Sequence, residues 1–363
     1  MDLTLASYDY ELPEDLIAQN PVTPRDSSRL LVVDSPTHHQ HRYFHDLPDL
    51  LQPGDLLVLN DTRVLRARLY GRKDTGTPVE VLLLEPRQSN CWLALVKPGR
   101  RLKPGAKIIF TPCINIDIKL KATVVATDAD TAGRLLQFEL PPGTDLEQLL
   151  PDFGHVPFPP YITASQALPE QYQTVYARPA DGPKNRQPGS VAAPTAGLHF
   201  TPELLKRLRQ RGIEQRYVTL HVGVGTFRPV EVEDVTSHQM HGEWISVPET
   251  TVAQIHQTQV RGGRVLAVGT TVARSLEGAA HSGELEAYTG KTELFIYPGY
   301  HWRVVDGLIT NFHLPRSSLL MLVSAMLGRD RLLHLYREAI GHQYRFYSFG
   351  DAMLILPDAW KII

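Results

Sequence analysis

The 363-residue sequence has only two cysteines, Cys91 and Cys113, and no Cys-x-x-Cys pair. This argues against a cysteine-based zinc site and a disulfide framework, so we expect a reduced, cytoplasmic protein. Long hydrophobic runs are also lacking: the longest, Leu319 to Leu327, contains Ser324 and is far too short to span a bilayer. We therefore expect no membrane partner. Residues 1–9 contain acids but no basic segment, so we expect no signal peptide.

The chain has little net charge, −2 at neutral pH, and is therefore not basic throughout. Its basic residues are concentrated: Asn60 to Lys107 holds eleven Lys or Arg against four Asp or Glu, a net charge of +7. Such a basic patch is typical of a nucleic-acid surface, although a solvated β-surface would have the same composition. The candidate contacts are Arg63, Arg66, Lys97, Arg100, Arg101 and Lys103.

Metal and nucleotide motifs are missing from the sequence. It has no His-Glu-x-x-His and no Walker lysine motif. The histidines His38, His39 and His41, with His45 further on, could bind a metal as neutral imidazoles. No cysteine or acid lies at a useful spacing, and the cluster follows Pro36 in a polar stretch. We therefore expect an exposed loop there and no metal site.

The stretch from Ser190 to Thr201 combines a buried segment, a turn and a helix start. Val191 to Ala193 are small and apolar, which predicts a short buried strand, and Pro194 ends it because proline offers no N–H to a sheet. Thr201 suits the N-cap of the next helix, and Gly212 suits its end. A well-capped βαβ unit without a ligand would show the same pattern. The turn residues that could face a ligand are Thr195, Gly197 and His199.

Glycines and threonines follow two other expected strands. The strand at 215–222 leads into Gly223 and Gly225, but this Gly-x-Gly lacks the third glycine and acidic partner of a dinucleotide fingerprint. We interpret it as a close approach of the backbone to a ligand. Thr270 and Thr271 follow a further strand and open a helix, where free N–H groups could receive an anion or be capped in the ordinary way.

Two more groups of polar residues are candidates for chemistry. His241 and Glu243 are two residues apart, so in an extended segment both point to one face, although a surface histidine and a salt-bridged glutamate would give the same pattern. Arg316 could hold a carboxylate. The segment from Tyr344 suits base stacking and cation contact, or simple packing of tyrosines at a sheet edge. The later candidates are Asn311, His313, Arg316, Tyr344, Arg345 and Asp351.

The element pattern predicts two domains. Residues 63–147 read as short strands separated by Gly/Pro turns without helical periodicity, which predicts a small β-barrel. Strands and helices alternate in residues 1–62 and 148–363, which predicts a discontinuous α/β domain around a largely parallel sheet, open or closed into a barrel. The β-barrel is therefore an insertion.

Five stretches in order resemble the signature of the S-adenosylmethionine:tRNA ribosyltransferase-isomerases of queuosine synthesis. Each stretch alone is a modest signal, but the five in order make a strong one. The resemblance runs from residue 8 to about residue 356. The stretches are VAAPTAGLHFT at 191–201, HVGVGTFRPV at 221–230, MHGEW at 240–244, VGTTVAR at 268–274 and NFHLPRSS at 311–318. The polar loop at 178–189 is longer than the family's usual connection, and its role stays open.

The resemblance implies an irregular, barrel-like α/β catalytic domain with an inserted small β-barrel. It implies transfer of the ribosyl group of S-adenosylmethionine, not its methyl, to 7-aminomethyl-7-deazaguanine at the tRNA wobble position. Rearrangement of the ribose gives epoxyqueuosine, and adenine and methionine leave. S-adenosylmethionine is then a co-substrate, the basic segment contacts tRNA, and we expect no cofactor and a monomer.

The family motifs place Glu243 and His241 with His199, Arg274 and Arg316. We expect Glu243 to face the sulfonium and His241 or His199 to handle protons. Two other functions stay open. A non-catalytic RNA-binding or translation factor would not bind S-adenosylmethionine. An ordinary methyltransferase would need an acidic ribose clamp after a glycine-rich turn, which the sequence does not show.

Overall fold

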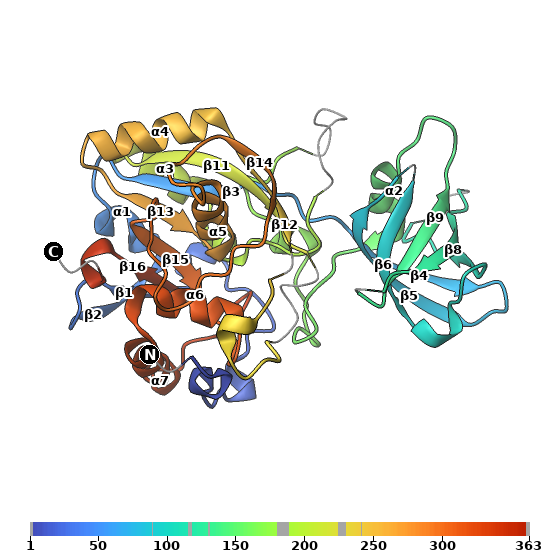
Figure 1. The fold of residues 1–363 in the computed structure, drawn as a ribbon, viewed down its shortest axis with the longest axis horizontal. Coiled ribbons are helices and arrows are strands. Elements are labelled where there is room, and N and C mark those ends of the chain that lie inside the picture. The colour runs from blue at the N-terminus through green and yellow to red at the C-terminus, as the bar shows by residue number, and fades with distance from the viewer. Residues whose placement is uncertain are drawn as a thin grey trace. The chain divides into compact units, whose positions relative to one another are not determined.

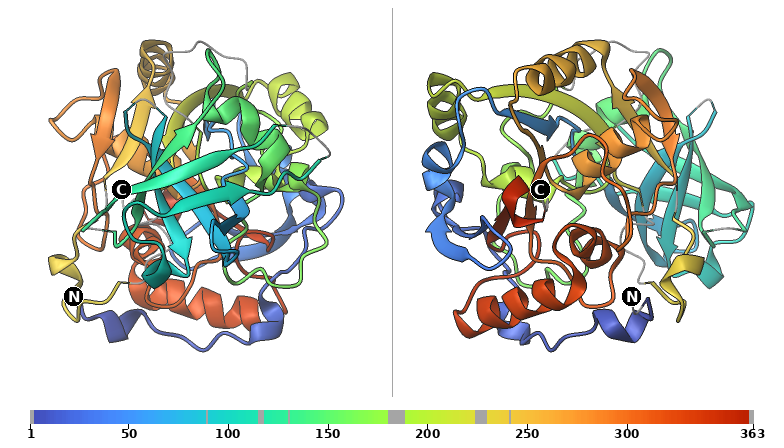
Figure 2. Two further views of the ribbon diagram at one scale, coloured as in Figure 1. Left: turned by 90° about the vertical axis from the view of Figure 1, so that its right-hand side faces the viewer. Right: turned by 60° about the vertical axis from the view of Figure 1, so that its left-hand side comes forward.

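The computed structural model describes residues 3–88, 90–114, 118–129, 131–179, 189–223, 230–240 and 242–360. The chain divides into two compact units, shown in Figures 1 and 2. Unit 1 comprises residues 1–62, 160–178 and 193–363, and unit 2 comprises residues 63–159 and 179–192. His241, Gly225 and residues 180–188 of the polar loop lie outside the described residues.

The chain returns to unit 1 at residue 160, later than the expected position 148. Helix α2, Leu146–Phe153, is the reason, because its apolar side chains are buried in the core of unit 2. Strand β10, Gly154–His155, then pairs with the barrel strand β4. A bridge between Val64 and Ser190 also ties the segment before residue 193 to unit 2.

Unit 1 is built on a nine-stranded mixed sheet. The central strands β11, β3, β13 and β15 are parallel, and β16 is parallel to β1, whereas the remaining neighbours are antiparallel. The α/β class is as predicted, but the sheet is mixed, with parallel pairing confined to four central strands and the β16–β1 pair. The strand order is β14 (Tyr288–Thr292), β12 (Glu243–Val247), β11 (Glu214–His221), β3 (Leu56–Asn60), β13 (Val265–Val268), β15 (Gly307–Asn311), β16 (Ala352–Ile355), β1 (Arg29–Val33) and β2 (His39–Tyr43).

Alternate residues of the central strands enter two different cores, as the two-residue period of a strand requires. On β3, Leu56 and Val58 join one core, and Leu57 and Leu59 join the other. Helices therefore cover both faces of the sheet (Figure 1). One core contains side chains of α4 (Glu249–Val260), α5 (Thr270–Ala279), α6 (Ser318–Leu327) and α7 (Arg329–Gly341), and the other those of α1 (Leu47–Leu50) and α3 (Pro202–Gln210).

The helix starts agree with the sequence at α3 and differ at α5. The Thr201 hydroxyl accepts a hydrogen bond from the Leu204 N–H at 3.1 Å, which confirms the predicted N-cap. At α5 the N-cap is Gly269, with φ of +93°, so the expected capping by Thr270 or Thr271 is wrong. A positive φ at this turn suits glycine because it has no Cβ.

Two local expectations are wrong. Val191 to Ala193 are buried but form no strand; the chain runs through Pro194 into a 3₁₀ turn, Thr195–His199. Their apolar composition predicts burial correctly, but three residues carry too little pattern to predict sheet pairing. The histidine-rich segment forms β2, paired antiparallel with β1, where the sequence predicted a loop.

Unit 2 is a closed six-stranded antiparallel barrel, as predicted. The closure is made by β4, whose second half pairs with β7 while its first half pairs with β10. The barrel order is β4 (Arg68–Lys73), β5 (Pro78–Pro86), β6 (Cys91–Lys97), β9 (Arg134–Glu139), β8 (Lys121–Thr127) and β7 (Lys107–Phe110). Both cysteines are free thiols. Among the described residues, no helix of either unit is long and apolar enough to cross a membrane.

Candidate functional site

One edge of the unit 1 sheet, where the ends of seven neighbouring strands meet, carries polar residues at or beside six of these strands. The carboxyl ends of β11, β3, β13 and β15 meet the amino ends of β12, β16 and β1 there. Open α/β sheets hold their ligands at this edge. The polar side chains at the edge are Glu243, His221, Asn60, Asn311, Asp351 and Ser28.

His199 is fully buried beneath this edge. Its Nδ1 lies 2.7 Å from the Ser28 hydroxyl, and its Nε2 lies 3.1 Å from Nδ2 of Asn311 and 3.4 Å from Nη2 of Arg25. Amide and guanidinium nitrogens only donate, so Nε2 accepts and the Nδ1–H donates to Ser28. Burial, with Arg25 and Arg345 nearby, holds the pKa of His199 well below its usual range. His199 is therefore a neutral imidazole with both nitrogens occupied.

Asn311 connects three of the predicted residues. Its Oδ1 accepts from the Thr195 hydroxyl at 3.1 Å, and its Nδ2 donates to the backbone oxygen of Tyr347 at 3.0 Å as well as approaching His199. Gly197 lies in the same turn as Thr195, and a Cβ there would collide with the Tyr176 hydroxyl. The structure thus brings Thr195, His199 and Asn311 together.

Asp351 holds a turn that presents arginines beside Asn311. Its buried carboxylate accepts the backbone N–H groups of Arg29 at 3.0 Å and Arg345 at 2.8 Å. The guanidinium groups of the same two residues lie 3.4 and 3.6 Å from its oxygens. Asp351 is therefore fully engaged in positioning, and Arg345 is brought to the site as predicted.

Arg25 and Arg345 carry unused hydrogen-bonding capacity. Nη1 of Arg25 and Nη2 of Arg345 are buried without a hydrogen-bond partner among the described residues. Burial and the neighbouring Arg345 lower the pKa of Arg25 to about 9, although Asp351 opposes the shift. Two buried donors of this kind suit an anion, which would form charge-assisted hydrogen bonds with both. Sequence reasoning missed Arg25 and Arg29, because neither lies in a recognisable motif.

Glu243 and Arg274 form a second group further along the edge. The buried Glu243 begins β12, and its Oε2 is paired with Nη1 of Arg274 on α5. Its Oε1 accepts the N–H of Gly223 at 3.2 Å. Nε of Arg274 donates to the backbone oxygen of Leu294 at 3.1 Å, while Nη2 is buried without a partner in the described part of the chain. The structure thus brings Glu243 and Arg274 together, as the family motifs implied, and adds Gly223 to them.

His221 lies beside Glu243 and was missed as a site residue. Its ring stacks on Trp244 with centroids 4.9 Å apart and planes at 13°. Nδ1 donates to the Thr62 hydroxyl at 2.8 Å, because Nε2 must accept from Arg178 at 3.3 Å. Burial, and then Arg178, lower the pKa of His221 to about 3. Its place at the end of a predicted strand, two residues before Gly223, was an available signal.

Asn60 and Thr271 lie between the two groups in strand order. Nδ2 of Asn60 donates to the Thr271 hydroxyl at 3.3 Å, and Oδ1 of Asn60 accepts the N–H of Leu220 at 3.1 Å. Thr270 is buried at the first position of α5. Because four strand steps of about 4.8 Å separate β12 from β15, Glu243 and Asn311 are roughly 19 Å apart along the sheet. The predicted single cluster is therefore two groups on one edge.

Three predicted residues lie away from these groups. Arg316 holds the carboxylate of Asp9 through Nε at 2.9 Å on an exposed surface, so its expected place beside Glu243 is wrong. His313 is a core residue: Nε2 pairs with the Thr310 hydroxyl at 2.8 Å, and burial lowers its pKa to about 3. Tyr344 is fully buried under the Arg29 guanidinium, so it cannot stack on a base.

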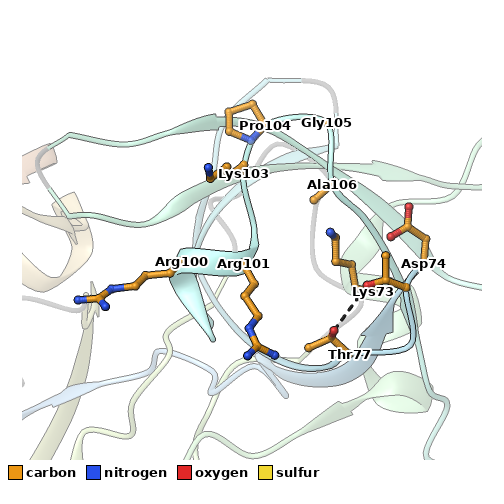
Figure 3. A pocket seen from close by; sticks show the side chains of 10 residues that line it. Lys73, Asp74, Thr77, Arg100, Arg101, Lys103, Pro104, Gly105 and Ala106 are labelled. Carbon is orange, nitrogen blue, oxygen red and sulfur yellow. Dashed lines mark hydrogen bonds between the residues drawn. The ribbon is translucent and has the colours of Figure 1, made fainter.

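Unit 2 carries the basic surface. A hollow of about 650 Å³ lies beside the short turn Gly99–Arg101. In Figure 3, Arg100 and Arg101 extend from this turn and Lys73 lies across the hollow. Among the ion pairs of the described residues, none involves Arg100, Arg101 or Lys103. The lining residues are Lys73, Asp74, Thr75, Thr77, Arg100, Arg101, Lys103, Pro104, Gly105 and Ala106.

Arg134 holds the turn that presents Arg100 and Arg101. From β9, its Nε donates to the Leu102 oxygen at 2.6 Å and its Nη2 to the Gly99 oxygen at 2.7 Å. Sequence reasoning missed this residue, because its partners are backbone atoms more than 30 positions away. The other candidate contacts lie outside the hollow: Arg66 donates to the Pro151 oxygen at 3.0 Å, Lys97 ends β6 and Arg63 begins unit 2.

Comparison with known proteins identifies the family. The family model described as Queuosine biosynthesis protein matches residues 5–355. Proteins named S-adenosylmethionine:tRNA ribosyltransferase-isomerase from Trichormus variabilis and Nostoc sp. are 62% and 64% identical, over 99% of this chain and 93% of theirs. The crystal structure of S-adenosylmethionine tRNA ribosyltransferase from Thermotoga maritima aligns with a TM-score of 0.54 and 40% identity, covering 96% of this chain and 100% of that one. The chain therefore belongs to the S-adenosylmethionine:tRNA ribosyltransferase-isomerase family of queuosine biosynthesis.

Proposed function

We propose that this chain transfers the ribosyl group of S-adenosylmethionine to 7-aminomethyl-7-deazaguanine at the wobble position of tRNA. The ribose is isomerised to the epoxycyclopentane of epoxyqueuosine, and adenine and methionine are released. The observation that carries this proposal is the identity of 62% and 64% to relatives bearing this enzyme's name, over 99% of the chain.

The chemistry needs a base near the 5′ carbon, whose C–H is acidified by the adjacent sulfonium, and an acid for the departing adenine. It also needs a water-poor site and an extruded wobble base. Glu243 is the best-supported candidate for the sulfonium side. It is buried at the ligand-binding edge of the sheet, and Arg274 and the Gly223 N–H fix its orientation. A fixed carboxylate in a dry site interacts strongly with a cation.

The group around Arg25 and Arg345 has the character of an anion pocket. S-adenosylmethionine carries a carboxylate, and tRNA carries phosphates, so both substrates could supply the anion that the two unused donors require. His199 has both ring nitrogens occupied and a strongly lowered pKa. We therefore assign His199 to positioning Asn311 and Arg25, and leave proton transfer to Glu243 and to His241, which lies outside the described residues.

The basic turn of unit 2 is our candidate for the tRNA backbone. Arg100, Arg101 and Lys103 are the candidates with the best support, because they line one hollow and Arg134 fixes their turn. Phosphate contacts of this kind position a nucleic acid without reading its sequence. We further propose that the enzyme acts in the cytoplasm as a monomer.

We also propose that turnover requires no metal, nucleotide or flavin, because the sequence contains no ligand motif for them. Exhaustive chelation should leave the rate unchanged when the folding of the tRNA is monitored in parallel. Loss of activity that one specific divalent ion restores would contradict this.

Product analysis tests the proposed function. The purified chain is incubated with S-adenosylmethionine and tRNA carrying 7-aminomethyl-7-deazaguanine. Chromatography then measures the amount of free adenine, which is compared with the amount of epoxyqueuosine formed in the tRNA. One adenine per epoxyqueuosine is expected. Methylated RNA with S-adenosylhomocysteine would indicate a methyltransferase, and RNA binding without any turnover would indicate a non-catalytic factor.

A further inference from the structure

The edge strand β2 of unit 1 and helix α7 bring two histidines and a glutamate together. His39 and His41 are two residues apart on β2 and therefore point to the same face. Their Nε2 atoms lie 2.7 and 3.2 Å from Oε1 of Glu338 on α7. No acid lies at a useful spacing from these histidines in the sequence, but the fold brings one from a helix about 300 positions later in the chain.

We propose that His39, His41 and Glu338 bind a divalent transition-metal ion, with zinc as the best match. Two imidazole nitrogens and one carboxylate oxygen are typical zinc ligands, and a water completes four-coordination. The three ligand atoms all lie within 4.8 Å of one another. Bonds of about 2 Å in a tetrahedron separate ligand atoms by about 3.3 Å, so the site needs adjustments of about 1.5 Å or less.

The surroundings of His41 resemble the support that metal-bound histidines receive. Nδ1 of His41 lies 2.8 Å from the hydroxyl of the buried Tyr344. With a metal on Nε2, the Nδ1–H donates to this hydroxyl and fixes both the tautomer and the ring orientation. The ring of His342 also packs on His41 with centroids 4.5 Å apart. The hydrogen bond and this contact hold the imidazole in place before any ion arrives.

The charge and access of the site also suit a cation. Glu338 supplies the carboxylate that complements the positive charge of an ion, and it already contacts both imidazoles. The side chains of His39, His41 and Glu338 are 23%, 36% and 24% exposed, so an ion can enter from solvent.

Metal binding would fasten β2 to α7. Because β2 pairs with β1 alone among the strands of the sheet, it has one free edge, and a metal bridge to α7, whose apolar face packs in the core, should stabilise it. An ion at 100 times its Kd should raise the thermal midpoint of unit 1 by about 5–10 °C. This effect is independent of the proposed activity.

Calorimetric titration of the chelator-treated, full-length chain with zinc chloride tests the site. We expect one zinc ion per chain, and at least tenfold weaker binding in His41→Gln and in Glu338→Gln. His38→Gln is the matched control, because His38 pairs with Asp34 instead and should bind as the parent does. Cys113→Ser is the second control, because Cys113 Sγ lies 3.3 Å from His155 Nε2 in unit 2 and could form a competing site.

X-ray absorption spectroscopy of the zinc-loaded parent identifies the atoms bound to the ion. It therefore tests the site even if the variants fail to fold. A first shell of nitrogen and oxygen with two imidazoles supports the site. Sulfur in that shell, loss of binding in Cys113→Ser, unchanged binding in His41→Gln and Glu338→Gln, or no zinc binding by the parent would each overturn it.

Discussion

The carboxylate of Glu243 on β12 and the guanidinium of Arg274 on α5 form a buried ion pair, with side chains only 4% and 6% exposed. A charge this deeply buried is costly unless it is paired and hydrogen-bonded. The Gly223 N–H and the Leu294 oxygen supply further hydrogen bonds, yet Nη2 of Arg274 remains without a partner in the described part of the chain. The pair therefore keeps one donor available for a ligand.

Glu243→Gln should lower turnover by about 10²-fold or more while leaving tRNA binding unchanged. Glutamine keeps an oxygen that can accept from Arg274 but loses the charge that faces the sulfonium and the basicity needed for proton transfer. Single-turnover rates measured well below the melting temperature check this, with circular dichroism confirming the fold.

The matched control for this variant is Glu249→Gln, at the exposed start of α4, which should change little. A Glu243→Gln protein that melts early but keeps near-normal specific activity would make Glu243 a purely structural member of the ion pair.

Arg25→Gln should lower kcat/KM by about 10- to 100-fold, because it removes a charge-assisted hydrogen bond to a substrate anion. A raised KM for S-adenosylmethionine alone would identify its carboxylate as the anion, and a raised Kd for tRNA alone would identify a phosphate. Arg42→Gln, an exposed arginine on β2, is the control. If both constants match the parent, no substrate anion occupies this pocket.

Reversing Arg100, Arg101 and Lys103 to Glu should weaken tRNA binding and flatten its dependence on salt. Each lost phosphate contact should reduce the slope of log K against log salt by about 0.7 to 0.9. Lys206→Glu with Arg207→Glu on the exposed face of α3 controls for charge reversal elsewhere on the surface. If the affinity and the salt slope are unchanged in the triple variant, tRNA binds through other residues.

Acid should destabilise the protein through its buried neutral histidines. The pKa values of His221 and His313 are about 3 when folded, against about 6.5 when unfolded, so the unfolded chain binds more protons in this window. The contribution is fully present above about pH 6.5 and falls, as the pH drops toward 3, by up to about 1.4 kcal/mol per unit for each histidine. The free energy of unfolding, measured by urea titration between pH 7 and 5, should change less steeply with pH in His313→Gln than in the parent. Equal slopes would mean that His313 is protonated in the folded state.

Sequence reasoning found much of the site because polar residues at strand ends are visible locally. Thr195, His199 and Asn311 were expected near a ligand and do meet, because the turn Thr195–His199 packs against the end of β15. Glu243 and Arg274 also meet, through a helix that crosses the adjacent strands.

The order of strands is not encoded locally, and most of the errors follow from that. The separation of Glu243 from Asn311 depends on the three strands between them, β11, β3 and β13, and β3 comes from a part of the chain far before either residue. Arg25 and Glu338 lie in no motif, and only tertiary packing gives them their partners. Tyr344 was recognised as aromatic, but its burial under Arg29 depends on the long-range placing of β1.

Differentially labelled S-adenosylmethionine tests the central claim most directly. Label in the ribose should appear in tRNA that carries 7-aminomethyl-7-deazaguanine, one per wobble base, while label in the methyl group should leave entirely with methionine. Methyl label in the tRNA with ribose label left in S-adenosylhomocysteine would contradict the account.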